Sequence, residues 1–139
     1  MVDKDLLFAK ISSVKKHLNR VKKQAGITLN EFLNDVDAQD IILFNLQLAI
    51  QNCIDIAAHI ISEEVMEVAG STSEMFYYLE ENSVIKQQLT EKMIKAVGLR
   101  NLIVHEYGNL DMKIVYEASR HDIKDLNDFL KAVVNAFNL

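Results

Sequence analysis

Residues 41–61 read IILFNLQLAIQNCIDIAAHII, and this segment decides the fold of the chain. Its apolar residues recur at helical spacing, and a second apolar set beside the main stripe leaves few polar sides. A helix that is apolar nearly all round is packed between other helices or against a second subunit. We therefore expect one central helix that runs from an N-cap at Asp37 to about Val68. Its main stripe consists of Ile42, Leu46, Ala49, Cys53, Ile56 and Ile60.

Two polar side chains in the second half of this central helix, Asp55 and His59, stand four positions apart. Side chains at that spacing lie on one face of a helix and are close enough to pair. A satisfied hydrogen bond in the interior or at an interface is the usual role of such groups. The sequence leaves open whether the pair belongs to a functional site or only braces the helix beneath one.

The segments before and after the central helix also have helical patterns. Apolar residues at steps of three and four predict a long helix over residues 5–25, with Gly26 as its stop. A hydroxyl residue followed three positions later by Glu is a capping box, and two of these predict short helices over 29–34 and 72–81. We expect Asn82 to close the second short helix in the left-handed conformation.

The C-terminal half predicts further helices. One long helix is expected from Ser83 or Val84 to Gly108, and another after a cap at Asp111. We expect His121 and the following Asp122 to interrupt that second helix, with a final helix to the C-terminus. The predicted fold is all-α: an up-and-down bundle of four to six helices that forms a single domain over residues 1–139.

Composition supports this reading and excludes several classes of protein. The 139 residues contain no proline, only four glycines and one cysteine, so a disulfide framework or a zinc cluster is excluded. A net charge of −5 argues against a protein that coats nucleic acid through a broad basic face. The N-terminus lacks the layout of a signal peptide, and no uncharged apolar run approaches the roughly 20 residues that span a bilayer. We expect a cytoplasmic protein without a membrane segment.

Residues 98–108, which read GLRNLIVHEYG, carry the densest cluster of chemically capable side chains. In an ideal helix Arg100 and Tyr107 lie within about 20° of each other, and Asn101 shares a face with His105. Arg100 and His105 are about 140° apart. For both to serve one site, the helix must distort near its end, Arg100 must curl round, or a second subunit must complete the site. Of the two glycines, Gly98 is expected where another backbone approaches closely, and Gly108 at the helix end.

The side chains in this segment suit metal-free cleavage of RNA. A histidine can exchange a proton at neutral pH, so His105 can deprotonate the ribose 2′-hydroxyl. The hydroxyl then attacks the adjacent phosphate, which Arg100 holds. Asn101 could orient the imidazole or hold a phosphate oxygen, and Tyr107 could contact RNA or be modified. Spacing alone is a weak signal, because an Arg and a His in one helix are common.

The segment from Arg100 to Tyr107 resembles the Arg-x4-His-x-Tyr motif of HepT-like toxins, a branch of the HEPN ribonuclease superfamily. Asn101 is the kind of polar residue that commonly follows the arginine there. The resemblance extends over nearly the whole chain. Residues 45–51 and 54–61 look like the second helix of that family, and the connection over 73–85 is similar to its aromatic-containing connection.

The resemblance implies an all-α homodimer whose motif helices meet in a composite active site. Members of the family are endoribonucleases that need no metal or other cofactor, and each is the toxin of a toxin–antitoxin pair. Their antitoxin, MntA, is a nucleotidyltransferase that silences the toxin by adding AMP to the motif tyrosine. Carried over, Arg100 and His105 are catalytic, Asn101 is supporting and Tyr107 is the modified residue. RNA is the expected substrate, and no DNA is expected.

Two other functions remain open from the sequence. The chain could be a non-catalytic helical subunit that holds the substrate of a nucleotidyltransferase, with Arg100 only gripping phosphate. It could also be a purely structural bundle in which Arg100 is a salt-bridge partner at the edge of the core.

Overall fold

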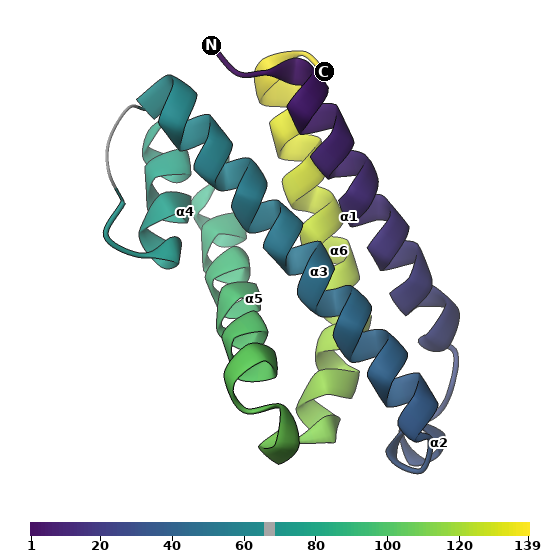
Figure 1. The fold of residues 1–139 in the computed structure, drawn as a ribbon. Helices are drawn as coiled ribbons and strands as arrows, with labels where there is room; N and C mark the ends of the chain where they lie inside the picture. Colours follow the sequence, from purple (N-terminus) through teal and green to yellow (C-terminus); the bar gives the residue numbers. More distant parts are fainter. Residues whose placement is uncertain (66–68) are drawn as a thin grey trace.

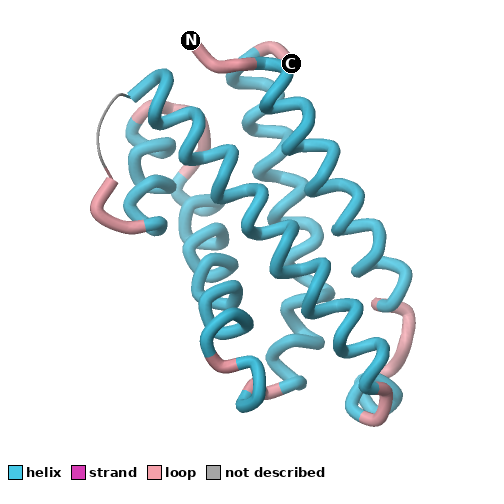
Figure 2. Tube along the Cα trace, viewed as in Figure 1, coloured by secondary structure: helices cyan, strands magenta, loops and turns pink. Residues whose placement is uncertain are grey.

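The computed structural model describes residues 1–65 and 69–139, and within them the chain is helical, without strands (Figure 2). The long helices lie side by side, and both termini are at the same end of the bundle (Figure 1). The all-α bundle predicted from the sequence is confirmed. Its elements in chain order are α1 (Lys4–Gln24), α2 (Leu29–Leu33), α3 (Val36–Ile60), the π-helical turn η1 (Ile61–Val65), α4 (Thr72–Glu81), α5 (Gln87–His105), the 3₁₀ turn η2 (Tyr107–Asn109) and α6 (Met112–Phe137).

Helix α3 is the central element, because it contacts α1, α2, α4, α5 and α6 (Figure 1). All six residues of its predicted main stripe are buried. The segment Val36–Glu64 is, among the described residues, the one helix that is long and apolar enough by composition to cross a membrane. Within the bundle, however, 56% of its apolar window is already buried by the neighbouring helices. Its apolar character is therefore that of a core helix.

The start of α3 differs from the prediction by two residues. Asp35, with extended backbone angles, is the N-cap, and its Oδ1 accepts a hydrogen bond of 3.1 Å from the N–H of Ala38. The predicted cap, Asp37, lies in the first helical turn, where its negative charge interacts favourably with the helix dipole. The predicted helix end at Val68 lies outside the described residues.

Both predicted N-caps are confirmed. The N–H of Glu31 bonds to the Thr28 hydroxyl at the start of α2, and that of Glu74 bonds to the Ser71 hydroxyl at the start of α4. Helix α1 ends at Gln24, just before Gly26.

The boundaries of the C-terminal helices differ from the predictions. Asn82 closes α4 without becoming left-handed, and the positive φ of 63° falls on Ser83 instead. Because that residue turns the chain, α5 begins only at Gln87. Helix α6 is continuous through His121 and Asp122, so the predicted interruption is wrong. Neither residue is a helix breaker, and polarity alone does not end a helix whose other face stays packed.

Asp55 and His59 do not pair with each other, although their spacing allows it; each has other hydrogen-bond partners. Asp55 accepts hydrogen bonds from Lys10 Nζ at 3.0 Å and from Gln51 Nε2 at 2.9 Å. His59 Nε2 accepts a hydrogen bond of 2.9 Å from the N–H of Asp3. Both residues thus fasten α1 to the C-terminal half of α3. This end of α3 is far from the C-terminal end of α5, so they brace the bundle and do not join the motif (Figure 1).

Candidate functional site

The candidate site is built where α5 ends and the chain turns into α6. Helix α5 ends at His105, because Glu106 adopts φ −133° and ψ 33° and leaves the helical conformation. The next three residues form η2, and the N–H of Asn109 bonds to the Glu106 carbonyl at 2.9 Å. The helix was expected to continue to Gly108. Because Tyr107 lies beyond the helix end, its predicted alignment with Arg100 on one face does not hold.

Tyr107 is instead tied to the start of α3. Its Oη donates a hydrogen bond of 2.7 Å to Oδ1 of Asp40, which stands 67 positions earlier in the chain. This hydrogen bond raises the pKa of Tyr107, since it favours the protonated phenol, and the negative charge of Asp40 adds to the effect. The tyrosine remains 53% exposed. Asp40 was not a candidate from the sequence, and no local pattern around it indicates this contact.

Arg100 is half-buried, and its guanidinium is turned toward the next residue. Nη1 donates a hydrogen bond of 2.9 Å to Oδ1 of Asn101. The Nε atom is buried and has no hydrogen-bond partner within the part of the chain that the structure describes. A buried donor that is left without a partner is costly. Asn101 therefore supports Arg100 here, and it does not orient the imidazole of His105.

His105 is the last residue of α5 and its side chain is exposed. Helix α5 is regular through His105, so the angle of about 140° between Arg100 and His105 stands. Neither a hydrogen bond nor an ion pair joins Arg100, His105 and Tyr107 within residues 1–65 and 69–139.

One face of α5 is exposed along the whole motif. Gly98, Asn101, Leu102 and His105 follow the helical spacing of three and four, and all are exposed; we call these four residues the motif face. Leu102 is 44% exposed. A Cβ atom built on Gly98 would meet nothing within 4 Å, so no backbone of the described chain approaches it. The expected close approach is wrong within a single chain.

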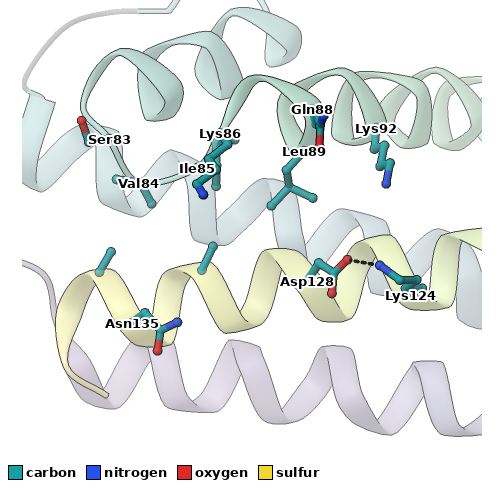
Figure 3. Close-up of a pocket in the computed structure, with 12 residues that line it drawn as sticks. Ser83, Val84, Ile85, Lys86, Gln88, Leu89, Lys92, Lys124, Asp128 and Asn135 are labelled. Carbon is teal, nitrogen blue, oxygen red and sulfur yellow. Dashed lines mark hydrogen bonds and ion pairs between the residues drawn. The ribbon is translucent and has the colours of Figure 1, made fainter.

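A cavity of about 570 Å³ lies at the other end of α5, between its first turns and the end of α6 (Figure 3). Lys86, the N-cap residue of α5, and Lys92 of α5 line it. An ion pair of 2.7 Å between Lys124 and Asp128 forms part of its α6 wall. Arg100, Asn101, His105 and Tyr107 do not line this cavity. In the described residues, no group of three or more His, Cys, Asp or Glu side chains is arranged to hold a metal ion.

Known proteins resemble this chain in sequence. The family model described as ribonuclease HepT-like matches residues 14–133. The mRNA nuclease HepT of Shewanella oneidensis is 33% identical over 129 residues, which cover 93% of this chain and 96% of that protein. The tRNA nuclease HepT of Aphanizomenon flos-aquae is 29% identical over 113 residues, which cover 81% of this chain and 77% of that protein.

A solved structure has the same fold. It contains the tri-AMPylated HEPN toxin of Shewanella oneidensis in complex with MNT antitoxin. The match has a TM-score of 0.85 at 32% sequence identity and covers 93% of this chain and 96% of that one.

Proposed function

Since this chain belongs to the HepT-like ribonuclease family, we propose that it is a metal-independent endoribonuclease and the toxin of a toxin–antitoxin pair. The observation that carries the proposal is the likeness over nearly the full chain to nucleases named HepT, in sequence and in fold. Residues 1–139 act in this proposal as one domain, in the cytoplasm, on RNA and not on DNA.

Arg100 and His105 are the catalytic residues of the proposed reaction. His105 accepts the proton of a ribose 2′-hydroxyl, and that oxygen forms a bond to the adjacent phosphorus. The bond from phosphorus to the 5′-oxygen breaks, and the leaving oxygen takes up a proton from water. The guanidinium of Arg100 holds the phosphate and stabilises the extra negative charge of the transition state. Asn101 holds Nη1, which limits the orientations of the guanidinium.

A homodimer completes the site in this proposal. The angle of about 140° between Arg100 and His105 keeps one helix from aiming both at the same phosphate. Two motif faces packed around a two-fold axis bring Arg100 of one copy toward His105 of the other. Support comes from the exposed Leu102 and from Gly98, whose open surroundings let a second helix approach.

The antitoxin is proposed to be an MntA-like nucleotidyltransferase that adds AMP to Tyr107. The likeness to a tri-AMPylated toxin in complex with MNT antitoxin supports this partner. Tyr107 is suited to modification, because half of its surface is exposed and it lies one residue beyond the end of α5.

Cleavage of total RNA by the purified protein in the presence of EDTA tests the proposal. We expect cleavage by the wild type and a loss of about 100-fold or more in His105→Ala and in Arg100→Ala. His121→Ala is a matched control, since His121 is also exposed but lies on α6. Equal cleavage by all variants would overturn the assignment of Arg100 and His105. No cleavage by the wild type, with binding to the nucleotidyltransferase retained, would favour the non-catalytic substrate-binding subunit.

A further inference from the structure

The hydrogen bond between Tyr107 and Asp40 puts a carboxylate beside the hydroxyl that the proposed function modifies. The two side chains come from η2 and from the start of α3, and the donor and acceptor oxygens are 2.7 Å apart. Both residues are exposed, so a second protein can reach the pair. Asp40 also makes no ion pair within the described residues, which leaves its carboxylate to the tyrosine.

A phenol is a weak nucleophile at neutral pH, because its ordinary pKa is about 10 and little phenolate is present. The contact with Asp40 raises the pKa of Tyr107 further, so the phenolate does not form in advance. Transfer of a nucleotide to this oxygen therefore needs a base that takes the proton while the new bond forms. A base must lie within hydrogen-bond reach of that proton, at about 2.6–3.2 Å. The Asp40 carboxylate meets this condition.

We propose that Asp40 is the general base for AMP transfer to Tyr107, an inference that rests on the proposed function. Tyr107 Oη forms a bond to the α-phosphorus of a nucleoside triphosphate that the nucleotidyltransferase supplies. The bond from that phosphorus to the β-phosphate bridging oxygen breaks, and pyrophosphate leaves. The phenolic proton moves to Oδ1 of Asp40. The product tyrosine ester has no proton to donate, so the link between η2 and α3 is lost.

The proposal predicts that Asp40 affects the first AMP transfer differently from any later AMP transfer. An AMP added to the sugar of the first AMP would use a ribose hydroxyl as nucleophile, and that hydroxyl is not the group bound to Asp40. Asp40 should therefore matter for the first AMP only. A residue that merely kept the fold intact would affect every addition alike.

The test uses single-turnover AMP transfer by the cognate MntA-like nucleotidyltransferase with MgATP, read by intact mass and by peptide mapping of Tyr107. Asp40→Asn keeps an acceptor oxygen in place but cannot take the proton. We expect the first transfer to slow by about 100-fold or more, with later additions and ribonuclease activity nearly unchanged. Asp37→Asn is the matched control, since Asp37 is an exposed carboxylate one turn earlier on α3. It should behave as the wild type.

The dependence on pH distinguishes a base from a residue that only positions the tyrosine. In Asp40→Asn the phenolate must form by loss of the proton to solvent, so the rate should rise about tenfold per pH unit between roughly pH 7 and 9. The wild-type rate should depend less on pH. A wild-type rate and pH profile in Asp40→Asn would overturn the role of Asp40 while leaving the modification of Tyr107 intact. Absence of AMP on Tyr107 in the wild type would instead overturn the modification itself, and the inference with it.

Discussion

Arg100 and Asn101 are neighbours on α5, and a hydrogen bond of 2.9 Å from Nη1 to Oδ1 joins their side chains. Adjacent residues on a helix ordinarily point about 100° apart, so this bond draws the guanidinium sideways toward the exposed motif face. The buried Nε atom remains without a partner in the described chain. This hydrogen bond limits the orientations of the Arg100 guanidinium, the group to which the proposed function assigns the phosphate.

Asn101→Ala should weaken RNA cleavage without abolishing it. The substitution removes the acceptor of Nη1 and leaves the charge of Arg100 in place. A hydrogen bond to a charged group contributes about 1.5–3 kcal/mol, which corresponds to a loss of about tenfold or more in kcat/KM. The effects of Asn101→Ala and Arg100→Ala should not add in the double variant, because both act through one guanidinium. Additive losses, measured on a short RNA substrate, would contradict this coupling.

Tyr107→Phe should cleave RNA like the wild type and escape silencing by the antitoxin. The ring is retained, but the Oη atom that donates to Asp40 and that would carry AMP is gone. The measurement is RNA cleavage after incubation with the nucleotidyltransferase and MgATP, compared with an incubation without ATP. Full silencing of Tyr107→Phe would show that modification acts elsewhere. Tyr77→Phe is a matched control, because Tyr77 is 50% exposed on α4.

Two substitutions of Gly98 should affect two different properties: the stability of the folded chain and its dimerisation. A Cβ atom meets nothing within the described chain, so Gly98→Ala should stabilise α5 by about 0.5–1 kcal/mol through its higher helix propensity. Gly98→Leu places a larger side chain on the motif face and should weaken the proposed dimer. Sedimentation or light scattering at several protein concentrations measures this. An unchanged dimer in Gly98→Leu would place the interface elsewhere.

The stability of the bundle should depend on the titration of Asp122 in α6. Burial raises its pKa from 3.8 to about 6, and the negative charge of Asp125 adds to the rise. In the folded state Asp122 therefore holds a proton that the unfolded chain has already lost between about pH 4 and 6. The free energy of unfolding consequently falls as pH rises through this window, by up to about 3 kcal/mol. Asp122→Asn should be more stable than the wild type at pH 7 and nearly equal at pH 4, as measured by urea denaturation.

The helix pattern could be predicted from the sequence where local chemistry decides it. The stripe from Ile42 to Ile60 is buried as predicted, and Thr28 and Ser71 cap their helices as predicted. Predicted helix boundaries were wrong where neighbouring residues can adopt the required backbone conformation at similar energy. Asp35 and not Asp37 caps α3, and Ser83 and not Asn82 takes the positive φ. Aspartate at either position can cap a helix, so residue type alone does not choose between Asp35 and Asp37.

The candidate site was only partly predictable. The spacing of Arg100 and His105 already indicated that they do not share a face, since helical geometry depends on the sequence interval alone. The end of α5 at His105 could not be read from that spacing, because no glycine or proline stands at Glu106. Because α5 ends at His105, Tyr107 turns toward α3 and away from the face that it was expected to share with Arg100.

By itself the sequence determined that the chain is all-helical, that α3 is its core, and that one short segment carries the arginine, histidine and tyrosine of the motif. These features follow from interactions between residues a few positions apart. Only the tertiary structure decided that Asp55 and His59 fasten α1 and that Asp40 receives the hydroxyl of Tyr107. Such contacts join segments separated by 45 to 67 positions. They are selected by how the helices pack, which no local pattern of residues records.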